Sequence, residues 1–528
     1  MSTNWWVAKR LRGPRVRSID IVIVVAYLVA MPVLGMLIAG RQRSSSDYFL
    51  GNRQLPWWAV CFSVVATETS TLTVISTPAI AYGGKFTFLQ LAFGYLIGRI
   101  VVAFVLLPRY YAGGLVTAYA FLGKRFGATL QGTASATFVI TRLLAEGTRL
   151  FAGALPIKVI LDAYGIHTSY VAIVVLLTAC TVIYTYVGGM RAVVWVDAIQ
   201  LLLYLGGAIA TIVVLSSKLP AGWVSKASGA GKFQVLDFTA SILTSPYSFV
   251  AAVVGGALLS MASHGADQLI VQRLLACRDL RSSQRALIGS GVVVFFQFGL
   301  FLLIGTMLWI FYRGASPTSM HQTASGDDLF PTFIIKQLPV GLSGLLIAGI
   351  LAATMGPLAS ALNTLSTSTV NDLYQRFTKR KLDDATVLRH GRTWTLVWAA
   401  VFVVFALPFS STKNPIIEKA LGITGYTYGA LLGAFFLGLL VRRASQADAV
   451  AAFLTTVAVM AFVILGVTFT GAGGKQLPLA YPWYTPVGVA VTLLVGGLLS
   501  LRHRAGAPPG DPSDPVVPKA VAGEIEAA

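Results

Sequence analysis

Charged residues are scarce in this chain. Asp, Glu, Lys and Arg make up only 11% of its 528 residues, whereas they make up about a quarter of a soluble globular protein. Apolar residues make up 56%, and the mean hydropathy is +0.75. A water-soluble enzyme, a fibrous protein and a disordered chain are all excluded by these proportions. They predict an all-α polytopic membrane protein, surrounded by the lipid bilayer.

Residues that build disulfides, metal sites and catalytic centres are also few. The three cysteines, Cys61, Cys180 and Cys277, are too scattered for a disulfide framework or a metal site. The five histidines form no cluster with the spacing of metal ligands. The sequence contains no glycine-rich phosphate loop and no nucleophile elbow. We therefore expect no enzyme activity and no bound cofactor.

Acidic residues are half as numerous as basic ones, with 20 Asp and Glu against 40 Lys and Arg. In a soluble chain this excess would suggest nucleic-acid binding. In a membrane protein, basic residues collect in the cytoplasmic loops instead, so we expect no nucleic-acid partner.

Long apolar runs are abundant. About 20 mainly apolar residues are enough to cross the hydrocarbon core as a helix. Thirteen segments meet this criterion, at 19–40, 55–82, 86–108, 128–163, 168–187, 191–216, 246–276, 284–312, 340–375, 391–410, 415–440, 446–470 and 483–501. We therefore expect one membrane domain over residues 19–504, after a basic leader (1–18) and before a Pro-rich, disordered tail (505–528).

An odd number of spans places the two termini on opposite sides of the membrane. With the C-terminus inside, the cytoplasmic segments hold most of the Lys and Arg, and Arg191 and Arg273 are counted among them. The basic leader contradicts this orientation, but the remaining loops favour it. We expect a multi-pass protein of the cell membrane with its N-terminus outside and its C-terminus in the cytoplasm.

Two of the spans are interrupted by polar residues. Segment 55–82 contains Ala66–Thr71, and segment 246–276 contains Ser260–Asp267. Paired broken helices in corresponding positions of two halves are typical of a transporter site. Broken backbone at membrane depth must be buried in protein or line a cavity. We expect the two breaks to face each other, within inverted repeats at about 55–216 and 246–440.

Several stretches resemble the sodium:solute symporter family, which includes sodium/glucose, sodium/proline and sodium/sialate transporters. The stretches are ATETSTLTVISTPAIAYGG (66–84), YVGGMRAVVWVDAIQ (186–200), DQLIVQRLLA (267–276), DLFPTFIIKQLPVGLSGLLIAGILAA (328–353) and AATMGPLASALNTLSTSTVNDLY (352–374). The resemblance implies a LeuT-type fold, in which two inverted five-helix repeats follow one extra helix and precede two more.

The resemblance also implies a solute site. An intramembrane carboxylate such as Glu68 is a functional candidate by default, although it could also be an Arg-paired structural acid. His264 could carry a proton or be a neutral, hydrogen-bonded histidine. The solute-side positions implied by the family are Glu68, Ser70, Thr73, Ser260, Ser263, His264, Gln297, Tyr426 and Tyr428. For the two tyrosines, ordinary helix packing is the alternative.

The family's sodium site is implied at Ala66, Thr69, Ala353, Gly356, Pro357, Asp197 and Ser360. Relatives carry two adjacent hydroxyls where this chain has Gly356 and Pro357. Because proline has no N–H, it frees the carbonyl of Ala353, but two oxygen ligands are missing. Asp197 is either a cation ligand or an acid at a helix start near the cytoplasmic interface.

Four further charged residues lie within predicted spans. Arg142, Glu146 and Arg149 share one span, and Arg99 lies in another. Intramembrane ion pairs either mark a transport pathway or brace helices, and we assign none of these residues a transport role.

These observations predict a monomeric secondary transporter that imports a small polar solute, such as a sugar, amino acid or carboxylate, by alternating access with sodium. Proton-coupled or uncoupled transport is the alternative, because of Gly356 and Pro357. A solute sensor without net transport is a second alternative.

Overall fold

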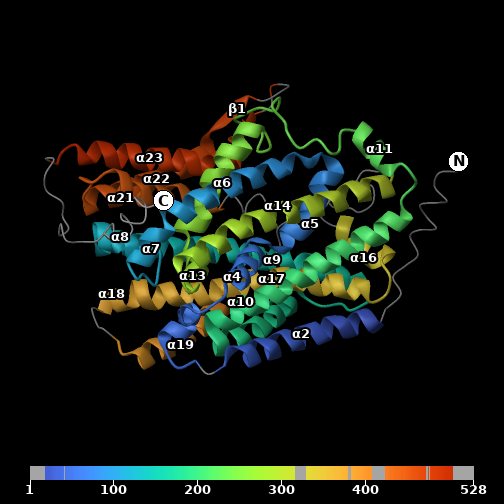
Figure 1. Cartoon of the computed structure of the whole chain (residues 1–528), viewed down its shortest axis with the longest axis horizontal. Coiled ribbons are helices and arrows are strands. Elements are labelled where there is room, and N and C mark those ends of the chain that lie inside the picture. The colour runs from blue at the N-terminus through green and yellow to red at the C-terminus, as the bar shows by residue number, and fades with distance from the viewer. Residues whose placement is uncertain are drawn as a thin grey trace.

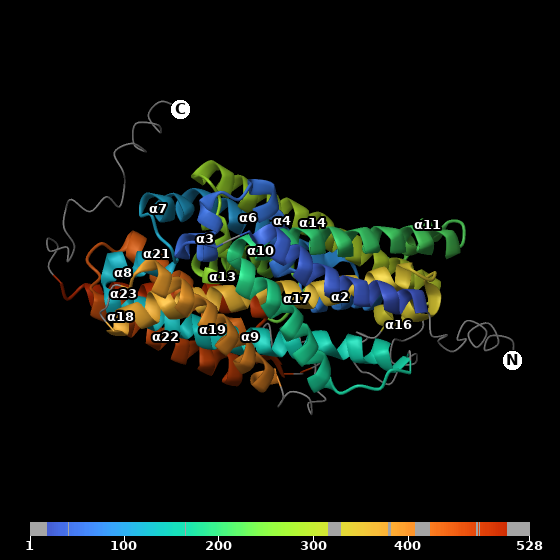
Figure 2. The same cartoon turned by 90° about the horizontal axis from the view of Figure 1, so that it is seen from below.

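The computed structural model describes residues 18–40, 42–163, 165–314, 329–378, 382–406, 423–470, 474 and 476–503. The predicted leader, apart from Ser18, and the predicted tail lie outside these ranges. Within them the chain folds into long helices packed side by side (Figure 1). The same bundle, turned by 90°, shows the helices running along its longest axis (Figure 2).

The long helices are α2 (Ser18–Ala39), α4 (Trp57–Glu68), α5 (Thr71–Gly83), α6 (Gln90–Val105), α9 (Ala128–Ala163), α10 (Tyr170–Lys218), α14 (Leu280–Phe311), α17 (Leu342–Ser368), α19 (Asp384–Ala406), α21 (Tyr428–Leu440), α22 (Gln446–Gly466) and α23 (Tyr484–Ser500). Shorter α-helices are α3 (Ser45–Leu50), α7 (Leu107–Ala112), α8 (Tyr119–Phe126), α11 (Trp223–Gly229), α12 (Gly256–Met261), α13 (Gln268–Leu275), α16 (Leu329–Gln337) and α18 (Gln375–Thr378).

Tighter and wider helical turns and one small hairpin connect these helices. The 3₁₀ turns are η1 (Gly51–Arg53), η2 (Phe86–Leu89) and η8 (Tyr481–Trp483). The π-helical segments are η3 (Ala251–Gly255), η4 (Ala262–Ala266) and η5 (Thr369–Tyr374). Strands β1 (Thr468–Thr470) and β2 (Gln476–Pro478) pair antiparallel.

Eight helices of the described residues are long and apolar enough to cross a membrane, or nine if the bent pair α4–α5 is one span. The predicted segments 168–187 and 191–216 lie on the two halves of α10, which is kinked at Gly189 with φ 51°. Tyr48 packs so closely there that a Cβ on Gly189 would lie 2.3 Å from its carbonyl oxygen. The remaining predicted segments fall mainly on helices where the structure describes them, but the end of segment 446–470 is wrong: α22 ends at Gly466 and Thr468–Thr470 form strand β1. The total of thirteen spans stays a prediction.

Both predicted interruptions are confirmed. Helix α4 ends at Glu68, and the backbone is extended at Thr69 and Ser70 before α5 begins, with a bend of 63° between the two helices. The second break follows η4, where Asp267 is extended before α13 begins.

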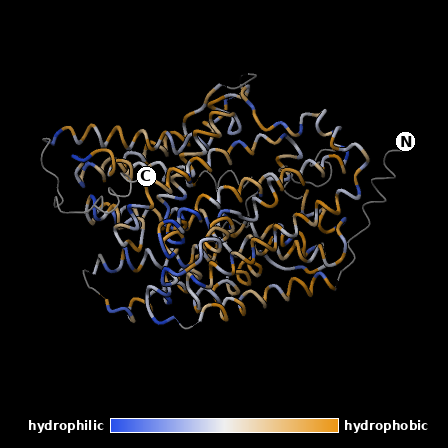
Figure 3. The backbone as a smooth tube through the Cα atoms, viewed as in Figure 1, coloured by the Kyte–Doolittle hydropathy of each residue, from blue (hydrophilic) through white to orange (hydrophobic). Residues whose placement is uncertain are grey.

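Helix α17 lies at the centre of the bundle, and nearly all of its residues are buried. It packs against α10, α9 and α2, while α21, α22 and α23 pack together at one side (Figure 1). Most of the length of the helices consists of hydrophobic residues, which are orange in Figure 3. Many on the outside are exposed, such as Leu37, Phe296 and Leu465, as expected for helices that face lipid.

Candidate functional site

The two helix breaks meet through their side chains. Glu68, the last residue of α4, forms an ion pair with Arg99 of α6, and its Oε2 lies 3.6 Å from Nε2 of His264 in η4. Segments almost 200 positions apart therefore converge on one carboxylate. The expectation that the breaks face each other is confirmed.

This group is held in place from several helices. The guanidinium of Arg99 is fully buried and donates to Ser290 of α14 at 2.8 Å, whereas the side chain of Glu68 is 18% exposed. The Ser263 hydroxyl lies 2.7 Å from Nδ1 of His264. The Ser260 hydroxyl donates to the carbonyl of Tyr95 at 3.0 Å. Glu68 is therefore paired with an arginine, as one of the two interpretations expected, and its side chain is still partly exposed.

The other predicted solute-side residues lie at different distances from this group. Gln297 donates to the hydroxyl of Thr69 at 2.7 Å, which brings it to the first break. Ser70 is buried beside that break and lines a small cavity with Arg149 of α9. Within the described part of the chain, no recorded polar contact joins the side chains of Thr73 or Tyr426 to Glu68 or His264.

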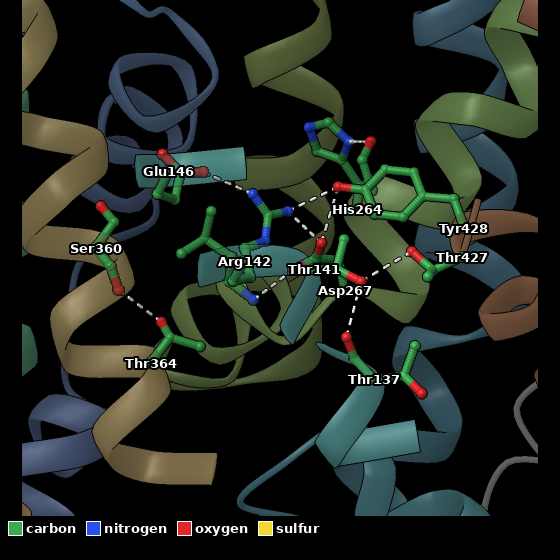
Figure 4. Close-up of polar contacts among 12 residues, drawn as sticks. Thr137, Thr141, Arg142, Glu146, His264, Asp267, Ser360, Thr364, Thr427 and Tyr428 are labelled. Atoms are coloured by element: carbon green, nitrogen blue, oxygen red, sulfur yellow. Dashed lines mark hydrogen bonds and ion pairs between the residues drawn. The ribbon is translucent and has the colours of Figure 1, made fainter. Parts of the chain in front are cut away.

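A second buried charge cluster lies beside the other break (Figure 4). Arg142 of α9 donates to Glu146 at 2.8 Å and to the Tyr428 hydroxyl at 2.7 Å, and it forms an ion pair with Asp267. Tyr428 donates to Asp267 at 2.8 Å, and Arg149 contacts Glu146 at 2.9 Å. Asp267 also caps α13 through the N–H of Leu269. These bonds tie α9, the second break and α21 together, which is the geometry of a brace.

The third cluster surrounds Asp197 of α10, which is fully buried. Its Oδ2 accepts a hydrogen bond from Ser63 at 2.7 Å and another from Thr67 at 3.4 Å. The guanidinium of Arg273 lies 3.6 Å from the same oxygen. Asp197 is therefore a buried carboxylate with partners on α4 and α13.

Counting Arg273 among the cytoplasmic-loop charges was wrong. Arg273 is fully buried, and it donates to Ser63 at 3.0 Å, to the carbonyl of Leu269 at 2.5 Å and to the hydroxyl of Ser360. Ser360 also lies 3.1 Å from the Thr67 hydroxyl. An arginine inside an apolar segment must be paired, and that was the signal in DQLIVQRLLA that sequence reasoning missed.

The predicted sodium-site positions are divided between two sides of α17. A Cβ added to Gly356 would lie 3.2 Å from Oδ1 of Asp197 and 3.9 Å from the carbonyl oxygen of Ala66. These three residues are thus together. Ala353 and Pro357 line the small cavity that also contains Ser70. Carboxylate and carbonyl oxygens are the ligands that hard cations take, so the first group can hold a cation.

Comparison with known proteins identifies the family to which this chain belongs. The model of the sodium:solute symporter family matches residues 48–456. The chain belongs to this family. It is therefore a transporter rather than an enzyme, and a multi-pass membrane protein.

Individual members of the family are similar over most of their length. The sodium/sialic acid symporter NanT of Aliivibrio fischeri is 28% identical over 91% of this chain and 92% of its own. The human sodium/iodide cotransporter is 28% identical over 82% of this chain and 67% of its own. The solved structure of a substrate-bound, outward-open Na⁺-coupled sialic acid symporter has a TM-score of 0.81 at 25% identity, covering 93% of this chain and 98% of that one.

Proposed function

We propose that this family member is a secondary active transporter that imports a small polar solute together with sodium by alternating access. The observation that carries this proposal is the meeting of two broken helices at Glu68 and His264, with a buried acid, Asp197, next to the first break. Unwound backbone of this kind holds solute and coupling ion in transporters. The similar proteins named above are sodium-coupled.

The proposed architecture is the LeuT-type fold with thirteen spans and inverted repeats at about 55–216 and 246–440. Two features support it: the kink that divides α10 into two halves, and the similarity to the sialic acid symporter structure. The proposed orientation has the N-terminus outside and the C-terminus in the cytoplasm, and the proposed functional unit is a monomer in the cell membrane.

The solute site is proposed between the breaks, at Glu68, Ser70, Thr73, Ser260, Ser263, His264, Gln297 and Tyr426. Relatives are named for sialic acid, iodide and monocarboxylates, all of which are anions at neutral pH. Small carboxylates and acidic sugars therefore come first among candidate solutes, before neutral sugars and amino acids.

Uptake into sealed proteoliposomes tests this function. Radiolabelled sialic acid, pyruvate, proline and glucose are compared under an inward sodium gradient, an inward proton gradient and no gradient. We expect one of these four solutes to accumulate inside the liposomes under the sodium gradient and only to equilibrate without it. If the protein binds one of these solutes but transports none of them under any gradient, it is a solute sensor.

Proton-coupled or uncoupled transport is the second candidate, and one observation favours it. The hydroxyl of Ser360, a predicted sodium ligand, is bonded to the guanidinium of Arg273, and Gly356 and Pro357 offer no hydroxyl. An internal cation therefore lies where relatives place ligands for sodium. Accumulation of the solute driven by the proton gradient alone would select proton coupling, and equilibration under every gradient would select uncoupled transport.

A further inference from the structure

A polar cavity lies between the end of the N-terminal helix and the kink of α10, on the side that the proposed orientation places in the cytoplasm. Its volume is about 330 Å³, which is at the lower end of the range for ligand pockets, about 300–1,000 Å³. Helices α2, α3 and α4 and the turn η1 all pack against α10. The lining includes Gln42, Asp47, Asn52, Arg191 and Trp195. None of these residues takes part in the clusters at the two helix breaks, so the cavity is a separate feature.

Two polar groups of this cavity have no partner among the described residues. Oε1 of Gln42 is buried without a hydrogen-bond partner, while Nε2 of the same amide donates to the Ala39 carbonyl at 2.8 Å. The side chain of Arg191 is exposed, and no hydrogen bond or ion pair joins it to another described residue. Asp47 adds a carboxylate, whose Oδ2 accepts from the backbone N–H of Arg43 at 3.2 Å. A guanidinium, a carboxylate and a free acceptor oxygen thus lie around one space.

The backbone beside the cavity has an unusual conformation. The three successive residues of η1, Gly51, Asn52 and Arg53, are left-handed, with φ of 55°, 54° and 53°. This region is disfavoured for residues other than glycine, and strain of this kind clusters at ligand sites. Gly51 and Asn52 both line the cavity, so the strained turn supports a ligand site here.

The surroundings of the cavity place it at the depth of the lipid headgroups. Helix α2 exposes Val25, Val29 and Leu37, as expected for a face against acyl chains, and the cavity begins where α2 ends. Trp58, in the first turn of α4, is 42% exposed, and its ring packs edge-on against that of Trp195, with centroids 5.1 Å apart. Tryptophan collects at the boundary between membrane and water. A lipid headgroup can therefore reach this cavity without leaving the bilayer.

We propose that this cavity binds the headgroup of an aminophospholipid, which is a phosphodiester that carries a primary ammonium. The guanidinium of Arg191 pairs with the phosphate, whose oxygens match its planar donors. The ammonium donates to the carboxylate of Asp47 and to Oε1 of Gln42. A purely anionic headgroup would leave the carboxylate next to a negative charge, and a quaternary ammonium has no N–H to donate. Such a site requires a chain embedded in a membrane but does not depend on the proposed transport function.

The test measures lipid binding through stability, because a ligand that binds the folded state raises stability with its concentration. The unfolding midpoint of the purified full chain in detergent micelles is followed as dioleoyl phosphatidylethanolamine is added. Parallel titrations use dioleoyl phosphatidylcholine, dioleoyl phosphatidylglycerol and soluble glycerophosphoethanolamine. We expect phosphatidylethanolamine to stabilise wild type saturably, and the other two lipids to need about tenfold more, on the scale of one hydrogen bond to a charged group. The soluble headgroup should have no effect over the same range, because it has no acyl chains to bring it to the cavity.

Three substitutions test whether this cavity is the site. Arg191→Gln removes the partner of the phosphate, so the half-saturating concentration of phosphatidylethanolamine should rise about tenfold. Without lipid this variant should unfold as wild type does, since Arg191 has no described partner to lose. Asp47→Asn keeps an acceptor but loses the charge, so it should reduce the preference for phosphatidylethanolamine over phosphatidylglycerol. The matched control is Arg443→Gln, which removes an exposed arginine between α21 and α22 that does not line the cavity, and it should bind the lipid as wild type does.

The proposal is overturned if phosphatidylethanolamine does not stabilise wild type, or if phosphatidylcholine or phosphatidylglycerol is equally effective. It is also overturned if Arg191→Gln and Arg443→Gln respond alike, or if Asp47→Asn leaves the lipid preference unchanged. Stabilisation by glycerophosphoethanolamine at the same concentrations would overturn it as well, because the cavity would then take a free phosphodiester rather than a lipid.

Discussion

Two acid–arginine pairs lie close to the first helix break, and they differ in what the carboxylate has left to offer. Glu68 gives the same oxygen, Oε2, to Arg99 and to His264, and its side chain is 18% exposed. Asp197 gives Oδ2 to Ser63 and Arg273 and is fully buried, while its Oδ1 stays unpartnered. The Glu68 pair is therefore partly open to a solute or to water, whereas the Asp197 pair is enclosed and leaves one carboxylate oxygen free.

The difference shows that charge alone does not assign a role to an intramembrane acid. Both pairs would look alike in a list of charges, since each has one carboxylate and one guanidinium. What separates them is whether water reaches the pair, and whether neighbouring oxygens converge on the free side of the carboxylate. The brace around Arg142 and Asp267 is a third case, in which tyrosine and a helix cap also bond the acid.

The largest effect should come from removing the arginine of the more buried pair. Arg273→Ala leaves Asp197 buried without its counter-charge, and breaking such a pair costs about 3–5 kcal/mol. Arg99→Ala should cost less, because Glu68 is partly exposed and can be hydrated. Thermal unfolding and monodisperse yield in detergent measure both variants. If both variants lose the same amount of thermal stability, burial does not distinguish the two pairs.

Glu68→Gln should reduce solute uptake by up to about a hundredfold, on the scale of about 1.5–3 kcal/mol for a hydrogen bond to a charged group. Expression and folding should stay nearly unchanged, because the amide oxygen can still accept from Arg99. Initial uptake rates in proteoliposomes, normalised to reconstituted protein, measure the effect. Wild-type kinetics in this variant would remove Glu68 from the mechanism.

Asp197→Asn should act on the cation rather than on the solute. The amide keeps an oxygen but loses the charge, so the half-saturating sodium concentration should rise about tenfold, which corresponds to about 1.4 kcal/mol. The solute concentration for half-maximal uptake, measured at saturating sodium, should change less. The reverse order of the two shifts would place Asp197 with Glu68 on the solute side.

The smallest effect should come from Tyr27→Phe, which removes the hydroxyl that holds the amide of Gln200. The Gln200 amide, which lies near Gly356 together with Asp197, is then less well oriented. The sodium requirement should therefore rise about threefold, on the scale of about 0.5–1.5 kcal/mol for one hydrogen bond. Sodium-dependent stabilisation measures it. A shift as large as that of Asp197→Asn would mean that the bond to Tyr27 matters as much as the charge of Asp197.

The sequence by itself determined the membrane class, the apolar character of the long helices and both helix breaks. These features are local: apolar runs of sufficient length must span, and the polar stretches Ala66–Thr71 and Ser260–Asp267 interrupt them. Family resemblance added Gly356, Asp197 and Ala66 as one group, and the fold brings them together.

The tertiary structure alone decided which charges pair and which oxygens stay free. Charge counting places Arg273 with the cytoplasmic residues, because local hydropathy cannot show that α13 packs against α4 and α17. Gln200 and Gly356 lie 156 positions apart and meet only because α10 packs along α17. Contacts between distant segments depend on how helices pack against one another, and a sequence pattern along one helix contains no information about the partner that it faces.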